Sequence, residues 1–267
     1  MVDRVLGSRV DAPTRYSPEI LEPVERQRGD ERLSPMLGAD VWHLYELSWL
    51  SREGWPTAFV GALAIPASSP RTVESKSLKL YLNSLNFHRF DNERAAVSTI
   101  MRDVQAVVGA SVDLTIAAPT ELAQWTREPA GVCIDDVFSG ALVAADWGAS
   151  RKTPFSQGED RVSETLISHQ LRSLCPVTGQ PDWGTLVVDY SGYRLDPAEL
   201  LSFVCSFREH QDFHEHCVEQ IYKKLFGDLS PEALTVTAYY QRRGGIDITP
   251  WRGHEKLDAP LWRMGRQ

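Results

Sequence analysis

The amino-acid sequence predicts an α+β fold made of two consecutive modules of similar design. In each half of the chain, two segments with the pattern of strands come first, a helical region follows and a further strand closes the unit. The chain has 267 residues, which at roughly 150 residues per domain fits one large domain or two small ones. We expect an irregular arm over residues 1–40, a first module over 41–155 and a second module over 156–267.

In the first module, four segments have the pattern of strands and a fifth is typical of a linking strand and loop: residues 41–50, 58–66, 78–85, 112–116 and 137–155. The segment 41–50 carries three aromatics, and 58–66 is almost wholly apolar. The third segment approaches the period-two alternation of a strand with one buried face. Asp91 is placed to cap a helix over about 92–108, and Gly109 ends that helix.

The second module repeats this order. Its predicted strands lie at residues 164–174, 185–190, 234–240 and 246–249. Asp196 followed by Pro197 predicts the start of a helix, because Asp is a good N-cap and Pro fits the first helical turn. A second helix is expected over 213–226, with Gly227 ending it.

The composition excludes some classes of function. Lys and Arg number 28 against 36 Asp and Glu, which gives a formal net charge of −8. Non-specific nucleic-acid binders carry a basic face, so we expect no direct nucleic-acid partner. The longest apolar stretch, residues 58–67, is shorter than the roughly 20 residues that span a bilayer, and the first residues lack a secretory signal pattern. The sequence therefore predicts a cytoplasmic protein without membrane contact.

The common nucleotide and hydrolase motifs are absent: the chain has no P-loop, no G-x-G-x-x-G after a strand, no G-x-S-x-G and no H-E-x-x-H. This argues against an enzyme of the Rossmann or P-loop type. The four cysteines contain no C-x-x-C pair and are expected to be free thiols in a reducing compartment.

The segment around Cys175 is the first that points to chemistry. This cysteine ends a predicted strand, in front of a tight loop fixed by Pro176 and Gly179, and Asp182 can fold back towards the thiol. A thiolate is a nucleophile, and a nearby acid can protonate the adduct that it forms. The alternative is an inert cysteine buried at a hairpin turn.

A histidine-rich segment follows at residues 207–217. His210 and His214 share a helical spacing and, with His216 and Cys217, suggest zinc. A polar helix junction with exposed histidines explains the same residues. A third possibility is that Glu215 accepts two N–H bonds from a flat, purine-like ring beside a histidine.

Two further segments concentrate positive charge. At the start of a predicted strand, Lys76 and Lys79 lie next to a carboxylate and two hydroxyls; exposed lysines on an edge strand are the alternative. Residues 242–245 place two arginines before two glycines, which allows close backbone approach and bidentate phosphate contact. A hairpin turn with exposed arginines has the same pattern.

Together, these segments resemble the NADPH-dependent 7-cyano-7-deazaguanine reductases, the nitrile reductases of queuosine biosynthesis. The motif E-S-K-S-x-K-x-Y stands at residues 74–81, C-P-V-T-G-Q-P-D at 175–182, F-H-E at 213–215 and R-R-G-G-x-D-I at 242–248. The resemblance extends from about Tyr45 to Trp251. It implies two tandem tunnelling-fold modules, in which antiparallel sheets carry helices on one face, with the site formed between the modules. It also implies association of such modules, here as a homodimer.

The resemblance implies a role for particular residues. Cys175 would add to the nitrile of 7-cyano-7-deazaguanine (preQ0) as a thioimide, and Asp182 would be the general acid and base. The implied substrate contacts are Val73, Glu74, Ser75, Phe213, His214 and Glu215. The implied cofactor contacts are Ser75, Lys76, Arg243 and Gly244. Two NADPH per turnover would give 7-aminomethyl-7-deazaguanine (preQ1) for tRNA modification, with no metal. Cys133, Cys205 and Cys217 are interpreted as structural.

Two other classes of function stay open at this point. A zinc-dependent pterin enzyme on the same fold would contain bound zinc, which metal analysis detects. A non-catalytic purine-binding or scaffold protein would need Glu215, while Cys175→Ala would change nothing else. The pair of Cys175 and Asp182 argues against the second class, because a binding protein needs neither residue.

Overall fold

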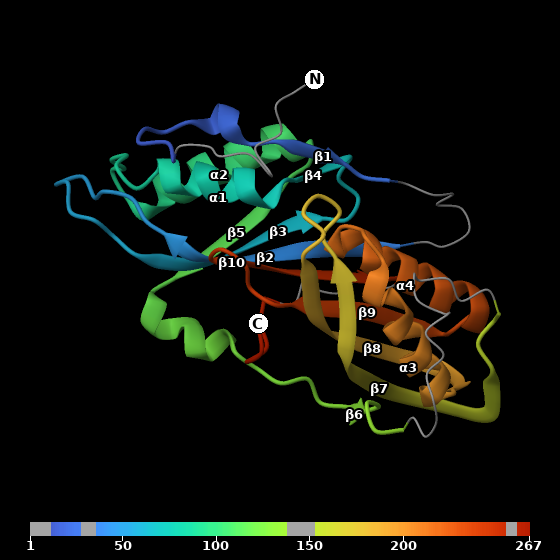
Figure 1. Ribbon diagram of the computed structural model, residues 1–267. Coiled ribbons are helices and arrows are strands. Elements are labelled where there is room, and N and C mark those ends of the chain that lie inside the picture. The colour runs from blue at the N-terminus through green and yellow to red at the C-terminus, as the bar shows by residue number, and fades with distance from the viewer. Residues whose placement is uncertain (1–11, 28–35, 138–152, 255–260) are drawn as a thin grey trace.

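A computed structural model describes residues 12–27, 36–137, 153–254 and 261–267. Eight of the described strands form one continuous sheet (Figure 1). All neighbouring strands in it are antiparallel except one terminal pair. Across the sheet the strands are β5 (Asp113–Ala117), β3 (Phe59–Pro66), β2 (Leu37–Leu47), β10 (Ile246–Gly253), β9 (Ala233–Tyr240), β8 (Pro181–Leu195), β7 (Gln157–Leu174) and β6 (Val132–Cys133).

Four α-helices cover the sheet, two over each half (Figure 1). They are α1 (Ser75–Ser84), α2 (Glu93–Val108), α3 (Pro197–Cys205) and α4 (His214–Leu229). A small second sheet pairs β1 (Pro23–Glu25) with β4 (Arg71–Val73), and three 3-10 turns cover Pro18–Ile20, Pro119–Trp125 and Ser206–Glu209. None of the described helices is both long enough and apolar enough to cross a membrane.

The two halves meet through β10, which pairs with β2 on one side and with β9 on the other. Two large apolar clusters lie between the helices and the sheet. One packs α1 and α2 on β2, β3 and β5, and the other packs α3 and α4 on β7, β8 and β9. A smaller cluster with Trp251 lies on the opposite face of the sheet.

The prediction of a strand over residues 78–85 is wrong, because this segment lies in α1 and the turn after it. Its apolar residues also fit a helix: the buried positions Leu78, Tyr81, Leu82 and Leu85 recur at spacings of three, one and three. The start of the helix is fixed by Glu74, whose carboxylate accepts the backbone N–H groups of Lys76 and Ser77. The N-cap at Glu74 therefore favours the helix over the strand that the short apolar alternation predicted.

Other boundaries differ by smaller amounts. Asn92, and not Asp91, caps α2 with a 2.9 Å bond from the N–H of Ala95, while Gly109 ends that helix as predicted. Asp196 caps α3 as predicted. The prediction that Gly227 ends α4 is wrong: the helix runs on to Leu229, since the buried stripe continues there. Of the predicted arm and linker, residues 1–11, 28–35 and 138–152 lie outside the described residues; β1 and the start of β2 belong to the arm.

Candidate active site

A cavity of about 320 Å³ opens where the two halves meet, and all of the predicted site residues line it. The first half contributes the start of α1 and the end of β4. The second half contributes the β7–β8 loop, the start of α4 and the β9–β10 turn. The predicted residues that share this cavity are Val73, Glu74, Ser75, Lys76, Cys175, Asp182, Phe213, His214, Glu215, Arg243 and Gly244.

Cys175 lies in the tight β7–β8 loop and is half-buried. Its N–H donates to the Gln180 carbonyl and its carbonyl accepts from the N–H of Gly179, both at 2.9 Å. Gly179 adopts φ +67°, a conformation that favours glycine. The Gln211 side chain donates to the Cys175 carbonyl at 3.2 Å. These bonds hold the backbone of the cysteine while the thiol borders the cavity.

Asp182 is a buried carboxylate that contacts a histidine and an arginine. One of its oxygens lies 3.1 Å from His214 Nε2, and the other accepts from the Arg243 guanidinium. Burial by itself raises the pKa of Asp182, but the hydrogen bond and charge of His214, together with Arg243, bring this pKa below its usual value. Asp182 is therefore ionised at neutral pH and able to accept a proton.

The ring of His214 is fixed by stacking. It lies 3.8 Å from the Tyr240 ring, at an interplanar angle of 8°. Its Nδ1 is buried, and among the described residues it has no hydrogen-bond partner. The other nitrogen contacts Asp182.

Glu74 and Glu215 face the cavity from the two halves, and both are buried. The Glu74 carboxylate accepts the N–H groups of Lys76 at 2.9 Å and Ser77 at 2.7 Å, so part of its capacity is already used by α1. Glu215 follows Phe213, the N-cap of α4. Burial first, and then the negative charge of Asp40, raise the pKa of Glu215.

The β9–β10 turn brings one of its two arginines to the cavity. Gly244 and Gly245 both have positive φ, of 60° and 85°, as a tight hairpin turn requires. Arg243 donates to Asp182 and, at 2.5 Å, to the Gln180 side chain. Arg242 lies instead over the Tyr45 ring at 4.8 Å. Of the two arginines, the resemblance implied a role for Arg243 alone.

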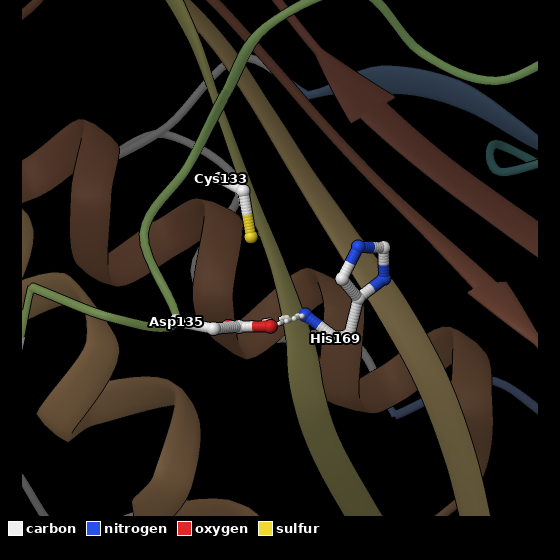
Figure 2. Close-up of side chains that lie close together, drawn as sticks. All are labelled: Cys133, Asp135 and His169. Carbon is white, nitrogen blue, oxygen red and sulfur yellow. Dashed lines mark hydrogen bonds between the residues drawn. The ribbon is translucent and has the colours of Figure 1, made fainter.

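The histidine-rich segment does not assemble into the zinc site that its spacing suggests. His214 contacts Asp182, His216 bonds Asp212 at 2.5 Å, and burial raises the pKa of Cys217 to about 12. Among the described residues, the cluster with metal-binding geometry lies elsewhere, at Cys133, Asp135 and His169 (Figure 2).

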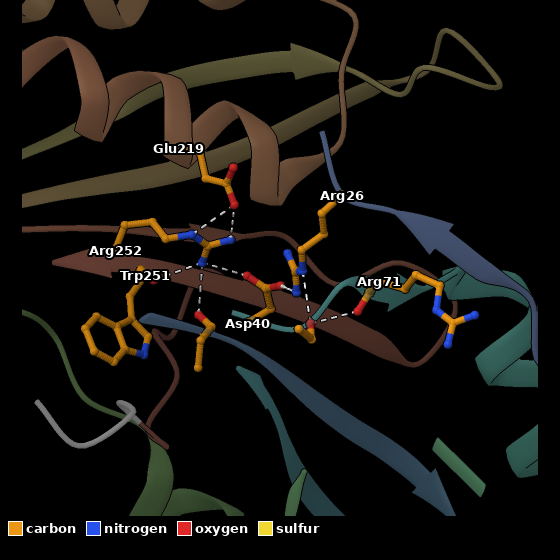
Figure 3. Close-up of polar contacts among 8 residues, drawn as sticks. Arg26, Asp40, Arg71, Glu219, Trp251 and Arg252 are labelled. Carbon is orange, nitrogen blue, oxygen red and sulfur yellow. Dashed lines mark hydrogen bonds and ion pairs between the residues drawn. The ribbon is translucent and has the colours of Figure 1, made fainter. Parts of the chain in front are cut away.

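The sequence analysis missed a buried charge network of Arg26, Asp40, Glu219 and Arg252 (Figure 3). Asp40 pairs with Arg26 at 2.5 Å and with Arg252 at 2.8 Å, and Arg252 pairs with Glu219 at 2.8 Å. Burial raises the pKa of Asp40, but the two guanidinium groups bring it below its usual value. A second, smaller cavity is lined by Arg26, Glu215 and Glu219. No local sequence motif predicts these contacts, because the partners are far apart in the chain.

Comparison with known proteins gives a consistent result. Residues 12–116 match the family model described as "Nitrile reductase, 7-cyano-7-deazaguanine-reductase N-term", and residues 181–259 match that described as "QueF-like protein". A protein of Chromohalobacter salexigens named NADPH-dependent 7-cyano-7-deazaguanine reductase is 43% identical over 98% of this chain and 96% of its own length. A protein of the same name from Acinetobacter baumannii is 41% identical over 98% of both chains.

A solved structure of an archaeosine synthase QueF-Like in the apo form overlaps 38% of this chain and all of its own. The identity is 18% and the TM-score is 0.33, which is too slight a likeness to bear on function.

Proposed function

The chain belongs to the family of NADPH-dependent 7-cyano-7-deazaguanine reductases, and from this membership we propose that it reduces the nitrile of 7-cyano-7-deazaguanine to an aminomethyl group in queuosine tRNA modification. The observation that carries the proposal is the shared cavity of a thiol, an ionised carboxylate and a stacked imidazole: Cys175, Asp182 and His214. A simple binding protein needs no such nucleophile and base.

The covalent step uses Cys175 as the nucleophile. Its sulfur bonds to the nitrile carbon, the C≡N bond becomes C=N, and the thiol proton passes to the nitrogen, which gives a thioimide. Asp182 is the group that takes and returns this proton, since its lowered pKa keeps it ionised beforehand. His214, at 3.1 Å from Asp182, holds the carboxylate and assists the transfer.

The reduction then releases the enzyme thiolate. NADPH supplies one hydride at each of two successive steps. After the first, the C–S bond breaks, Cys175 leaves as the thiolate and an imine remains. Asp182 and His214 supply the proton that accompanies the second. In balance, the nitrile, two NADPH and two protons give the amine and two NADP⁺.

The carboxylate of Glu215 recognises the substrate, because it can accept two N–H bonds from the deazaguanine ring. Glu74, Ser75 and Val73 border the same cavity from the first half, and Phe213 from the second. Because the Glu74 carboxylate already caps α1, we assign it mainly to holding Ser75 and the helix start in place.

The residues at one side of the cavity fit a phosphate-bearing cofactor. Lys76 supplies a cationic group and Ser75 a hydroxyl at the start of α1, where a helix favours anions, and Arg243 adds a second cationic group from the β9–β10 turn. The Arg243 side chain is 42% exposed and its guanidinium has five N–H donors. It can therefore bind a phosphate while it keeps its contact with Asp182. Gly244 has no Cβ to obstruct the approach.

We propose further that each half is a tunnelling-fold module, with the β2–β10 pair as the junction and boundaries near residues 41, 155 and 156. Each half contains a hairpin of long strands, two helices and further strand. Among the described residues, β5 and β6 are the outermost strands of the sheet, and their outer edges are places where a second copy can pair, which supports a homodimer. The four cysteines are unpaired, in keeping with the cytoplasm.

The test is reduction of the nitrile itself. Purified protein is mixed with NADPH and 7-cyano-7-deazaguanine, and the loss of NADPH absorbance is followed beside Cys175→Ala. We expect two NADPH consumed per nitrile, and none in the variant. Nitrile binding without consumption by the parent protein would support a binding protein instead, and consumption by Cys175→Ala would contradict the thioimide.

A further inference from the structure

A second set of reactive side chains lies at the outer edge of the sheet, away from the cavity. Cys133 ends β6, Asp135 follows it, and His169 lies in the neighbouring β7. One potential ligand atom of each residue lies within 4.8 Å of the others (Figure 2). None of the three lines the candidate active site. We propose that these residues bind a divalent transition metal, with Zn²⁺ as the best match.

The backbone brings the three residues together. β6 and β7 pair in parallel with Cys133 opposite Ile167, and the N–H of Ile134 donates to the Ile167 carbonyl at 2.9 Å. The pairing of β7 with β8 is irregular between Ser168 and Leu171. Cys133 from β6, Asp135 from the turn after it and His169 from β7 thus lie around one space.

The Asp135 carboxylate is already oriented by neutral donors. Its Oδ1 accepts the Ser168 hydroxyl at 2.7 Å, and its Oδ2 accepts the backbone N–H of His169 at 3.0 Å. Both donors are neutral, so these bonds leave the negative charge of the carboxylate available to a cation.

The imidazole of His169 is held in the way that metal-binding histidines usually are. Its Nδ1 lies 3.0 Å from the hydroxyl of Thr185, a buried residue of β8. With Nδ1–H donating to that hydroxyl, Nε2 keeps its lone pair for a metal. The Arg266 guanidinium bonds the His169 carbonyl at 2.9 Å and steadies the same residue.

The ligand types select the metal. A thiolate, an imidazole and a carboxylate suit Zn²⁺ or its neighbours, whereas Mg²⁺ and Ca²⁺ prefer oxygen ligands alone. With Zn–S near 2.3 Å and Zn–N near 2.1 Å, tetrahedral ligand atoms lie roughly 3.5 Å apart. Rotation of Cys133, which is exposed, closes the remaining gap. Two negative ligands balance the charge of the ion, and a fourth position is left for water.

The experiment measures metal binding directly. Full-length protein carrying Cys175→Ala, which removes the cavity thiol, is stripped with chelator and titrated with Co²⁺ and then Zn²⁺. We expect one Co²⁺ per chain with a thiolate-to-cobalt charge-transfer band, displaced by one Zn²⁺. Adding Cys133→Ser should abolish the band, and adding His169→Gln should weaken binding at least about tenfold.

Cys205→Ser is the matched control, because this thiol is half-buried and near Asp135: burial raises its pKa and the charge of Asp135 adds to that rise. It should leave the band unchanged. A band that survives Cys133→Ser, or the absence of stoichiometric binding, would overturn the proposal. If Cys133→Ser fails to fold by circular dichroism, Asp135→Asn and His169→Gln decide the question. Since no readout involves nitrile reduction, the result is independent of the proposed activity.

Discussion

The first turns of α1 and α4 face the same cavity from the two halves, and each brings a buried glutamate to it. Glu74 caps its own helix and accepts two backbone N–H groups. In α4 the N-cap Phe213 makes no side-chain bond, and Glu215 is left with a raised pKa caused by burial and the charge of Asp40. The difference agrees with the proposed roles: Glu74 is engaged by the backbone of its own helix, whereas Glu215 is the carboxylate proposed to bind the substrate.

The largest expected effect comes from Glu215→Gln. We expect kcat/KM to fall about a thousandfold, because two hydrogen bonds to a charged acceptor are lost at about 2 kcal/mol each. Stability should not fall, since the change removes a charge whose burial raises the pKa of the carboxyl. Steady-state kinetics and thermal unfolding of the same preparation check both expectations. A loss of stability as large as the loss of activity would assign Glu215 to the structure.

Arg26→Ala tests the buried charge network, whose Arg26 lines a small cavity together with Glu215. The variant leaves Asp40 with one of its two guanidinium partners, and we expect about 3 kcal/mol less stability in urea unfolding. It also removes a charge that lowers the pKa of Glu215. If Glu215 binds the nitrile substrate as a carboxylate, as proposed, the rise of binding with pH should move to higher pH in the variant. Arg71→Ala, on the adjacent β4, is the control; an unchanged pH profile in Arg26→Ala would separate the network from Glu215.

The pH dependence of stability should differ in sign between Glu215 and Asp40. The pKa of Glu215 is raised above its usual 4.5, so stability falls as pH rises through its folded pKa. The pKa of Asp40 is lowered below 3.8, so its contribution is present above 3.8 and is lost as pH falls through its folded pKa. Urea unfolding of the parent and of Glu215→Gln should therefore diverge above pH 4.5. Parallel curves would contradict the raised pKa.

Glu74→Gln should act on stability in the way that loss of a cap does. We expect a decrease of about 1 kcal/mol in the free energy of unfolding, because α1 loses a charged acceptor for its first N–H groups. The matched control is Asn92→Ala, which removes the cap of α2 away from the cavity. Similar stability with a much larger kinetic defect in Glu74→Gln would show that Glu74 also contacts substrate.

The smallest effect is expected from Gly227→Ala. This glycine lies inside α4, and an added Cβ meets nothing within 4 Å. Alanine favours the helix by about 0.5–1 kcal/mol, so the melting temperature should rise by about 2 °C. Activity should be unchanged, since the start of α4 is not disturbed. A lower melting temperature would mean that the helix needs the freedom of the glycine.

Local signals in the sequence predicted much of the fold. The Asp196–Pro197 start of α3 and the Gly109 end of α2 depend on neighbours in the chain, and both are confirmed. The strand predicted over 78–85 failed because a short apolar run fits either period, and the cap of Glu74 decided it. Contacts between distant residues carry no local signal. The pairing of β10 with β2 and the burial of Arg26 against Asp40 are of this kind.

The candidate site was predicted through the family resemblance, which named residues but neither their contacts nor their protonation states. Sequence motifs placed Asp182 and Arg243 in the same site, whereas their direct contact needed the structure. The hydrogen bonds by which Glu74 caps α1 also needed the structure, because the sequence pattern of residues 78–85 predicted a strand there and not a helix. Cys133 stood out in no motif, because its neighbours Asp135 and His169 come from a turn and another strand.

The position of β10 has a consequence for synthesis on the ribosome. Its partner β2 is made early, yet Ile246 pairs with Leu44 across about 200 residues of chain. Until that late segment emerges, β2 has an unpaired edge, and the cavity lacks both the Arg243 turn and its junction wall. The nascent protein therefore passes through a long interval in which its first half has an open strand to protect from aggregation.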